Sequence, residues 1–115
     1  MALWRVETTV ATQEQARGLA RRVVEHRLAA CVQIEPIESV YRWHDELVVE
    51  PEYRIVFKTT AGRYPALEAA LHAHHPYELP QIVAIQATAA EAGYANWVDA
   101  SVRVPPNQVP GPNKK

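Results

Sequence analysis

The chain has 115 residues, of which 48% are hydrophobic and 22% are charged. This length allows one domain with its own core and is short for two. The formal net charge is -1 at pH 7, so the chain lacks the excess of Lys and Arg that favours nucleic acid or anionic membranes as partners.

The single cysteine, Cys31, excludes an intrachain disulfide and a Cys-rich zinc module. No segment approaches the roughly 20 apolar residues of a membrane helix. The first ten residues, MALWRVETTV, contain charges and no apolar run of signal-peptide length. We therefore expect a cytoplasmic protein with no membrane partner.

The first elements predicted along the chain are a strand and an amphipathic helix. Residues 3–9 favour a short strand with Trp4, Val6 and Thr8 on one side. Thr12 follows as an N-cap, with Gln15 at the capping-box spacing. Apolar residues then recur at helical spacing, namely Ala16, Leu19, Ala20, Val23, Val24 and Leu28.

Residues 29–60 contain two strand patterns, each interrupted by a proline, as at a bulge or a sheet edge. A two-residue turn at His44 and Asp45 joins them into a long hairpin, and a turn at residues 50–52 is the alternative. The pairings implied by the first turn are Trp43 with Glu46, Ser39 with Glu50 and Pro36 with Tyr53.

A second helix is predicted to begin near Pro65 and to end before Pro76, which disfavours helical geometry in His75. Its buried stripe is predicted to consist of Leu67, Ala70, Leu71 and His74. Residues 81–88 favour a last strand. A short closing helix follows, with Tyr94, Trp97 and Val98 on one side.

The predicted order is β-α-β-β-α-β plus a C-terminal helix, which is typical of an α+β, ferredoxin-like split β-α-β sandwich with an antiparallel sheet. We expect one domain over residues 1–102 and a disordered tail over 103–115, which is rich in Pro, Gly and Asn. The hairpin from Ser39 to about Glu50 has too little chain to cover its own apolar side chains. We infer a homo-oligomer in which another copy covers them.

The stretch HAHHPYELP, residues 72–80, allows three interpretations. His72 and His75 share a helical face at a spacing that suits one metal ion, and His74 and His75 can converge where the helix ends. Alternatively, His74 extends the buried stripe and His75 caps the last carbonyl groups. Cys31 would be a soft ligand, but its surroundings, AACVQI, predict a core residue.

A second group of residues suggests a binding cleft. Lys58 ends an apolar strand and requires a partner, which Glu78 would supply. The whole group comprises Tyr41, Trp43, Lys58, Tyr77, Glu78 and Trp97. Either these residues pack at a subunit boundary around a structural ion pair, or they line a pocket for a small ligand. No serine in a Gly-rich elbow, no Gly-rich phosphate loop and no paired carboxylates indicate an enzyme.

Several separated motifs resemble the CutA family of divalent-cation tolerance proteins. They are RLAACVQIEPIESVYRW, EYRIVFKTT, HHPYELPQIVAI and YANWV, and the likeness runs from about Leu3 to Val102. The resemblance implies a ferredoxin-like subunit and a homotrimer in which the long hairpins join neighbouring sheets. It also implies a role in tolerance of copper and other divalent metals.

The resemblance implies metal ligands at His74 and His75, together with a cysteine at the end of the first strand. Thr8 occupies that cysteine position here, and its hydroxyl is a poor ligand for a soft metal. We therefore expect a weak or differently completed site, for example one that uses Glu78 or a second subunit. Asp45 is another departure, because the family usually has glycine in the hairpin turn.

The family also resembles the trimeric PII signalling proteins in architecture. Two hypotheses follow, since fold alone does not decide function. The first is a cytoplasmic homotrimer that binds divalent metal, Cu²⁺ among the candidates, weakly through His74 and His75 and acts in metal tolerance. The second is a small-ligand sensor or assembly scaffold with an intersubunit cleft, which would gather Tyr41, Trp43, Lys58, Glu78 and Trp97.

Overall fold

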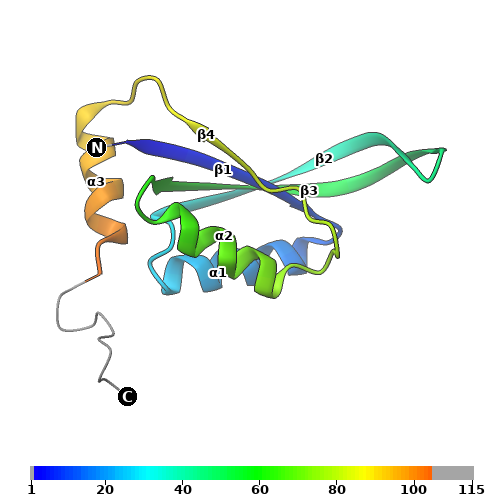
Figure 1. Cartoon of the computed structure of the whole chain (residues 1–115), viewed down its shortest axis with the longest axis horizontal. Coiled ribbons are helices and arrows are strands. Elements are labelled where there is room, and N and C mark those ends of the chain that lie inside the picture. Colours follow the sequence, from blue (N-terminus) through cyan, green and yellow to red (C-terminus); the bar gives the residue numbers. More distant parts are fainter. Residues whose placement is uncertain (1, 105–115) are drawn as a thin grey trace, which may run out of the picture.

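The computed structural model describes residues 2–104 and has the α+β, ferredoxin-like order that the sequence predicts. The elements are β1 (Leu3–Val10), α1 (Gln13–Glu25), β2 (Cys31–Trp43), β3 (Glu46–Thr60), α2 (Tyr64–His74), β4 (Val83–Gln86) and α3 (Ala92–Val102). The strands form one antiparallel sheet in the order β2-β3-β1-β4. Helices α1 and α2 lie along one side of this sheet, and α3 lies at the end where the chain starts (Figure 1).

The start of α1 is fixed by the predicted capping box. The Thr12 hydroxyl accepts a hydrogen bond from the Gln15 N–H at 3.1 Å, and the Gln15 side chain accepts one from the Thr12 N–H at 3.2 Å. These contacts satisfy backbone donors that have no partner inside the helix. Ala16, Leu19 and Val23 are then buried against the sheet as predicted, whereas Val24 is 43% exposed.

The core lies between the sheet and helices α1 and α2. Alternate residues of β1 and β3 face it, because successive side chains of a strand point to opposite faces. The helices close it from the other side. Its fully buried members include Val6, Val10, Ala16, Ile55, Phe57, Leu67 and Leu71.

The long hairpin has the predicted register, with Trp43 opposite Glu46 and Ser39 opposite Glu50. Its turn is formed by His44 and Asp45, which have φ values of 50° and 63°. Both residues thus take the left-handed conformation that a two-residue hairpin turn requires. The alternative turn at residues 50–52 is excluded, because β3 runs through them.

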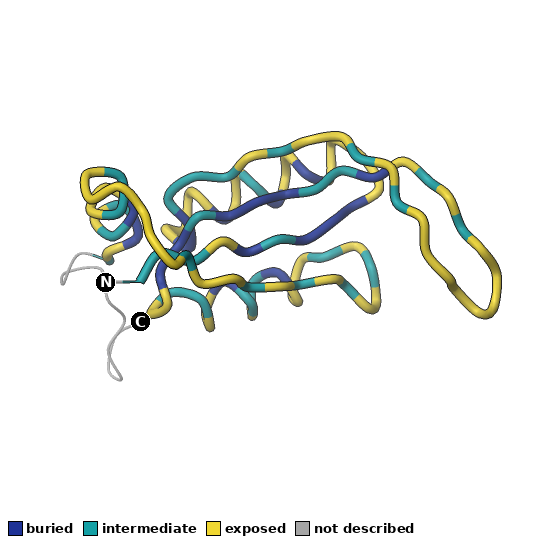
Figure 2. Tube along the Cα trace, turned by 90° about the horizontal axis from the view of Figure 1, so that it is seen from above, coloured by how far each residue is buried: buried dark blue, intermediate teal, exposed yellow. Residues whose placement is uncertain are grey.

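The outer part of the hairpin projects beyond the helices and is mostly exposed (Figure 2). We call residues 39–50 the outer hairpin. Its exposed large hydrophobic side chains are Val40, Tyr41, Trp43, Leu47 and Val49. The apolar surface predicted from the sequence is therefore present in the protomer.

The last part of the chain differs in detail from the prediction. Strand β4 spans Val83–Gln86 and is shorter than the predicted strand over residues 81–88. Helix α3 is formed as predicted, with Val98 and Val102 buried. The predicted tail over 103–115 lies almost wholly outside the described residues. Among residues 2–104, no helix is long and apolar enough to cross a membrane.

Candidate functional site

The two histidines before Pro76 lie at different depths at the end of α2. His74 is the last residue of the helix and is exposed. His75 follows as the C-cap in extended backbone, and its N–H donates to the Leu71 carbonyl at 2.8 Å. The prediction that His74 extends the buried stripe is wrong, because Leu67 and Leu71 are four residues apart and the next position at that spacing is His75.

The half-buried ring of His75 contacts two other segments. Its Nε2 atom lies 2.9 Å from Oγ1 of Thr8, a fully buried residue of β1. Its Nδ1 atom accepts a hydrogen bond from the Tyr77 N–H at 3.1 Å. The Tyr77 ring also packs against the imidazole, with ring centroids 5.1 Å apart. The structure therefore joins His75 to Thr8, the residue that stands where the resemblance implies a cysteine.

These contacts fix the protonation of the His75 ring. A backbone N–H is always a donor, so the Nδ1 atom that accepts from Tyr77 carries no proton. The proton of the neutral ring is then on Nε2, which donates to Thr8. Burial lowers the pKa of His75, and the nearby charge of Glu52 opposes this shift. The geometry and the pKa shift both favour a neutral imidazole.

The protomer does not present a closed metal site at this helix end. Both ring nitrogens of His75 are engaged, and His74 is exposed. His72 pairs with Glu68 at 3.8 Å on the exposed face of α2. Within residues 2–104, no group of three or more His, Cys, Asp or Glu side chains converges as metal ligands would. The donor set of a single copy therefore fits at most a weak, open site.

A buried carboxylate that the sequence did not single out lies close to these histidines. Glu52 of β3 is 7% exposed and accepts hydrogen bonds from the Ser39 hydroxyl at 2.7 Å and the Tyr77 hydroxyl at 2.8 Å. Burial and the Glu52 hydrogen bond raise the pKa of Tyr77. The sequence offered one signal, because the predicted hairpin register places Glu52 near Ser39.

The outer hairpin holds a second pair of a phenol and a carboxylate. The Tyr41 hydroxyl donates to Glu50 at 2.5 Å, and this hydrogen bond raises the pKa of Tyr41 to about 12. Both carboxylates thus bind protonated hydroxyl groups. Polar side chains therefore gather where the hairpin leaves the body of the domain.

The five predicted cleft residues are spread over four parts of one protomer. Tyr41 and Trp43 lie on the outer hairpin, Glu78 in the loop after α2, and Trp97 on the exposed side of α3. Lys58 lies on β3, where its ammonium group donates to Gln33 at 3.1 Å. Among residues 2–104 of one protomer no ion pair joins Lys58 to Glu78, and a contact between them across two copies stays a prediction. Its partner in the protomer is the side-chain amide of Gln33 on the neighbouring strand β2.

Cys31 differs from its predicted core position. It is partly exposed at the start of β2, opposite Lys58 in the strand register. Its thiol lies beside the Tyr94 hydroxyl, where burial and the thiol raise the pKa of the tyrosine. The strand places Cys31 on the sheet face that bears Lys58, opposite the face covered by α1 and α2, which is why it lies outside the main core.

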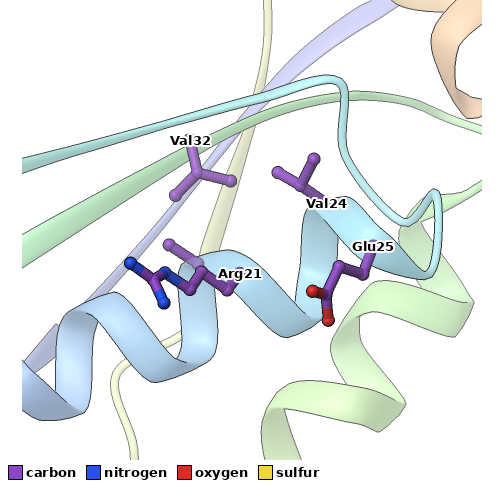
Figure 3. Close-up of a pocket in the computed structure, with 5 residues that line it drawn as sticks. Arg21, Val24, Glu25 and Val32 are labelled. Carbon is purple, nitrogen blue, oxygen red and sulfur yellow. The ribbon is translucent and has the colours of Figure 1, made fainter.

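An open hollow of about 320 Å³ lies between α1 and β2, at the opposite end of α1 from the histidines. Figure 3 shows Val24, Arg21 and Glu25 on α1 and Val32 on β2 around it. Its lining is mainly apolar, with charged groups at its edge. It offers no converging donors for a metal ion.

Comparison with known proteins agrees with this fold and with the motifs. The family model described as CutA1 divalent ion tolerance protein matches residues 4–101. The divalent-cation tolerance protein CutA of Thermus thermophilus is 42% identical over 91 residues, which cover 78% of this chain and 88% of that protein.

Solved structures of relatives superpose closely on the chain. The structure of CutA from Synechococcus elongatus has a TM-score of 0.86 and 39% identity, and the match covers 89% of this chain and 91% of that one. A second structure of CutA from the same organism, complexed with a Bis-Tris molecule, has a TM-score of 0.81 and 40% identity, covering 87% and 93%. Family membership supports a role in metal tolerance. The sequence motifs, the sheet order and these similarities establish that the chain belongs to the CutA1 family of divalent ion tolerance proteins.

Proposed function

We propose that this protein acts in the response to divalent metal ions as a homotrimer that binds divalent metal, including Cu²⁺, weakly and has no catalytic role. The observation that carries the proposal is the exposed apolar outer hairpin, since a sheet edge of this kind is normally covered in a soluble protein. Its residues Val40, Leu47 and Val49 are all more than half exposed in the protomer.

The assembly is tested by placing a charge on the outer hairpin. Leu47→Glu introduces a carboxylate at a residue that is 71% exposed, so the protomer tolerates it, whereas a covered interface does not. We expect light scattering to give the mass of three 12.9 kDa chains for the wild type and a smaller mass for the variant. Val24→Glu, at an exposed position on α1, is the matched control and keeps the mass of the wild type. A wild-type mass of one chain contradicts the proposal.

Metal binding in this proposal takes place at the end of α2, where His74 is exposed. A single exposed imidazole binds Cu²⁺ weakly, because the ion normally takes several protein ligands. A second copy of the chain is the proposed source of further donors. Calorimetric titration with Cu²⁺ tests this: we expect dissociation constants in the micromolar range or weaker, and loss of binding in His74→Ala at unchanged mass.

A second candidate function is sensing of a small ligand in a cleft between copies. It is favoured by the Bis-Tris molecule bound to a relative that is 40% identical to this chain. The aromatic side chains of Tyr41 and Trp43 are exposed on the outer hairpin and suit such a ligand. Calorimetry with Bis-Tris tests this candidate, and Trp43→Ala or Lys58→Ala would abolish binding if the cleft lies at those residues.

A further inference from the structure

We infer that His75 of this chain is a structural residue whose ring joins β1 to the loop after α2, and that it is not a metal ligand. The two adjacent histidines then have different roles, and His74 is the one available to bind a metal ion. It rests on the proposed metal binding for the role of His74 only. The structural role of His75 follows from its hydrogen bonds.

Neither nitrogen of the His75 ring offers a lone pair to a metal without a rearrangement. The Nδ1 lone pair is directed at the Tyr77 N–H, 3.1 Å away. The Nε2 atom holds the proton of the neutral ring and donates it to Thr8 at 2.9 Å. A metal at Nε2 would require the other tautomer, in which the Nδ1 proton faces the Tyr77 N–H and both lose an acceptor.

That rearrangement lowers affinity for a metal. A partly buried donor left without an acceptor disfavours the new tautomer by an amount equivalent to a factor on the order of 10 to 100 in a binding constant. Displacing the Tyr77 N–H so that a metal reaches Nδ1 would also leave a donor unsatisfied. His74 needs no such change, because its side chain is exposed and its ring makes no hydrogen bond to another group among residues 2–104.

The bonds of His75 continue into a longer chain of contacts at the base of the hairpin. Thr8 accepts from His75, which accepts from the Tyr77 backbone. The Tyr77 hydroxyl donates to Glu52, and Glu52 also accepts from Ser39. We call these five residues the hairpin-base network. It links β1, the end of α2, β3 and β2 at the point where the outer hairpin leaves the sheet.

Thr8 is the residue that makes this arrangement possible. Its hydroxyl oxygen is a good acceptor for the imidazole N–H, whereas a thiol sulfur in the same place would be a weak one. Thr8 is also fully buried, so the contact with His75 is shielded from water. Where the resemblance implies a soft cysteine ligand, Thr8 therefore supplies a hydrogen-bond acceptor instead.

The first test is the tautomer of His75 in the metal-free protein. Long-range ¹H–¹⁵N correlation spectra of histidine side chains at neutral pH distinguish Nε2–H from Nδ1–H. We expect His75 to be an Nε2–H tautomer with an unprotonated Nδ1. A predominant Nδ1–H tautomer, or averaging of the two, would overturn the inference.

The second test compares histidine variants in titrations with Cu²⁺. We expect His75→Gln to keep the copper affinity within about threefold, because His75 does not bind the metal directly. We also expect this variant to have a lower melting temperature. We expect His74→Gln to lose binding and to keep the melting temperature. Equal loss of copper binding in both variants at wild-type mass and melting temperature would contradict the division of the pair.

A third variant covers the case in which His75→Gln does not fold. Thr8→Val removes the acceptor and keeps the ring, so we expect a lower melting temperature and an unchanged copper affinity. Thr9→Val is the control, since the neighbouring hydroxyl makes no hydrogen bond among residues 2–104 and the change leaves the network intact. A Thr8→Val protein with the stability of Thr9→Val would overturn the inference. If the wild type binds no Cu²⁺, the proposed metal binding fails, and the tautomer and the melting temperatures still decide the role of His75.

Discussion

The outer hairpin continues strands β2 and β3 of the domain body, but the two regions depend on different partners. In the body, β3 packs through Ile55 and Phe57 against residues of α1 and α2, and these side chains are fully buried by the chain itself. In the outer hairpin, the same strand exposes Leu47 and Val49. One strand can therefore bury its apolar side chains within the protomer at one end and leave them exposed at the other.

The hairpin-base network marks the boundary between the two regions. Glu52 lies between the buried part of β3 and its exposed part, and it takes hydrogen bonds from both neighbouring segments. A buried carboxylate is tolerated there because its oxygens are hydrogen-bonded. The boundary is therefore held by hydrogen bonds between polar side chains, while the core beside it is held by apolar packing.

The largest expected effect on the free energy of unfolding comes from a substitution in the body of the domain. Phe57→Ala removes a side chain that is 0% exposed and should lower the free energy of unfolding by about 3–5 kcal/mol, because the cavity cannot fully collapse. Denaturant unfolding at fixed protein concentration measures this. Val49→Ala is the counterpart in the outer hairpin and should cost less than about 1 kcal/mol in the isolated protomer, where Val49 is 55% exposed. A Val49→Ala loss that grows on dilution would indicate contact with a second copy.

A smaller effect is expected at the turn of the outer hairpin. Asp45 has φ 63°, a conformation that glycine adopts without the steric cost of a side chain. Asp45→Gly should raise the free energy of unfolding by about 1 kcal/mol. Glu46→Gly, one residue further on in β3, is the control and should lower it. A loss of stability in Asp45→Gly would show that the aspartate side chain contributes more than the turn conformation costs.

The smallest effect is a local dependence on pH at α3. The Glu91 carboxylate caps this helix and accepts from the Tyr94 N–H at 2.8 Å. Hydrogen bonds from the Gly93 and Tyr94 backbone lower the pKa of Glu91 below its ordinary value of 4.5. The folded pKa is the lower one, so the cap is fully stabilising above pH 4.5 and is lost as the pH falls through the folded pKa.

Hydrogen exchange of the Tyr94 amide measures this change, after correction for the intrinsic rate. We expect its protection to fall between pH 4.5 and the more acidic folded pKa. Glu91→Gln retains an acceptor without a charge and should show no such decrease. Equal pH dependence in both proteins would assign the effect to another group.

Much of the fold could be predicted because its signals are local. Thr12 and Gln15 lie three residues apart and form the capping box as predicted. The turn at His44 and Asp45 sets the hairpin register, because each later pair follows from the first. Helical spacing predicted the burial of Leu67 and Leu71.

The depth of single side chains at element ends could not be predicted in the same way. His74 and Cys31 belong to apolar patterns, but each lies where its element begins or ends, and a small rotation there changes what covers the side chain. The position of Lys58 was predicted, but not its contact with Gln33, because the two residues are 25 positions apart.

The sequence by itself determined the order of the elements, the register of the hairpin and membership of the CutA1 family, because each depends on residues close together or on motifs in a fixed order. Tertiary structure alone decided that Thr8 meets His75 across 67 positions and that Glu52 receives two hydroxyl groups. The physical reason is the short range of hydrogen bonds. Their partners are fixed only when the sheet and the end of α2 have packed together.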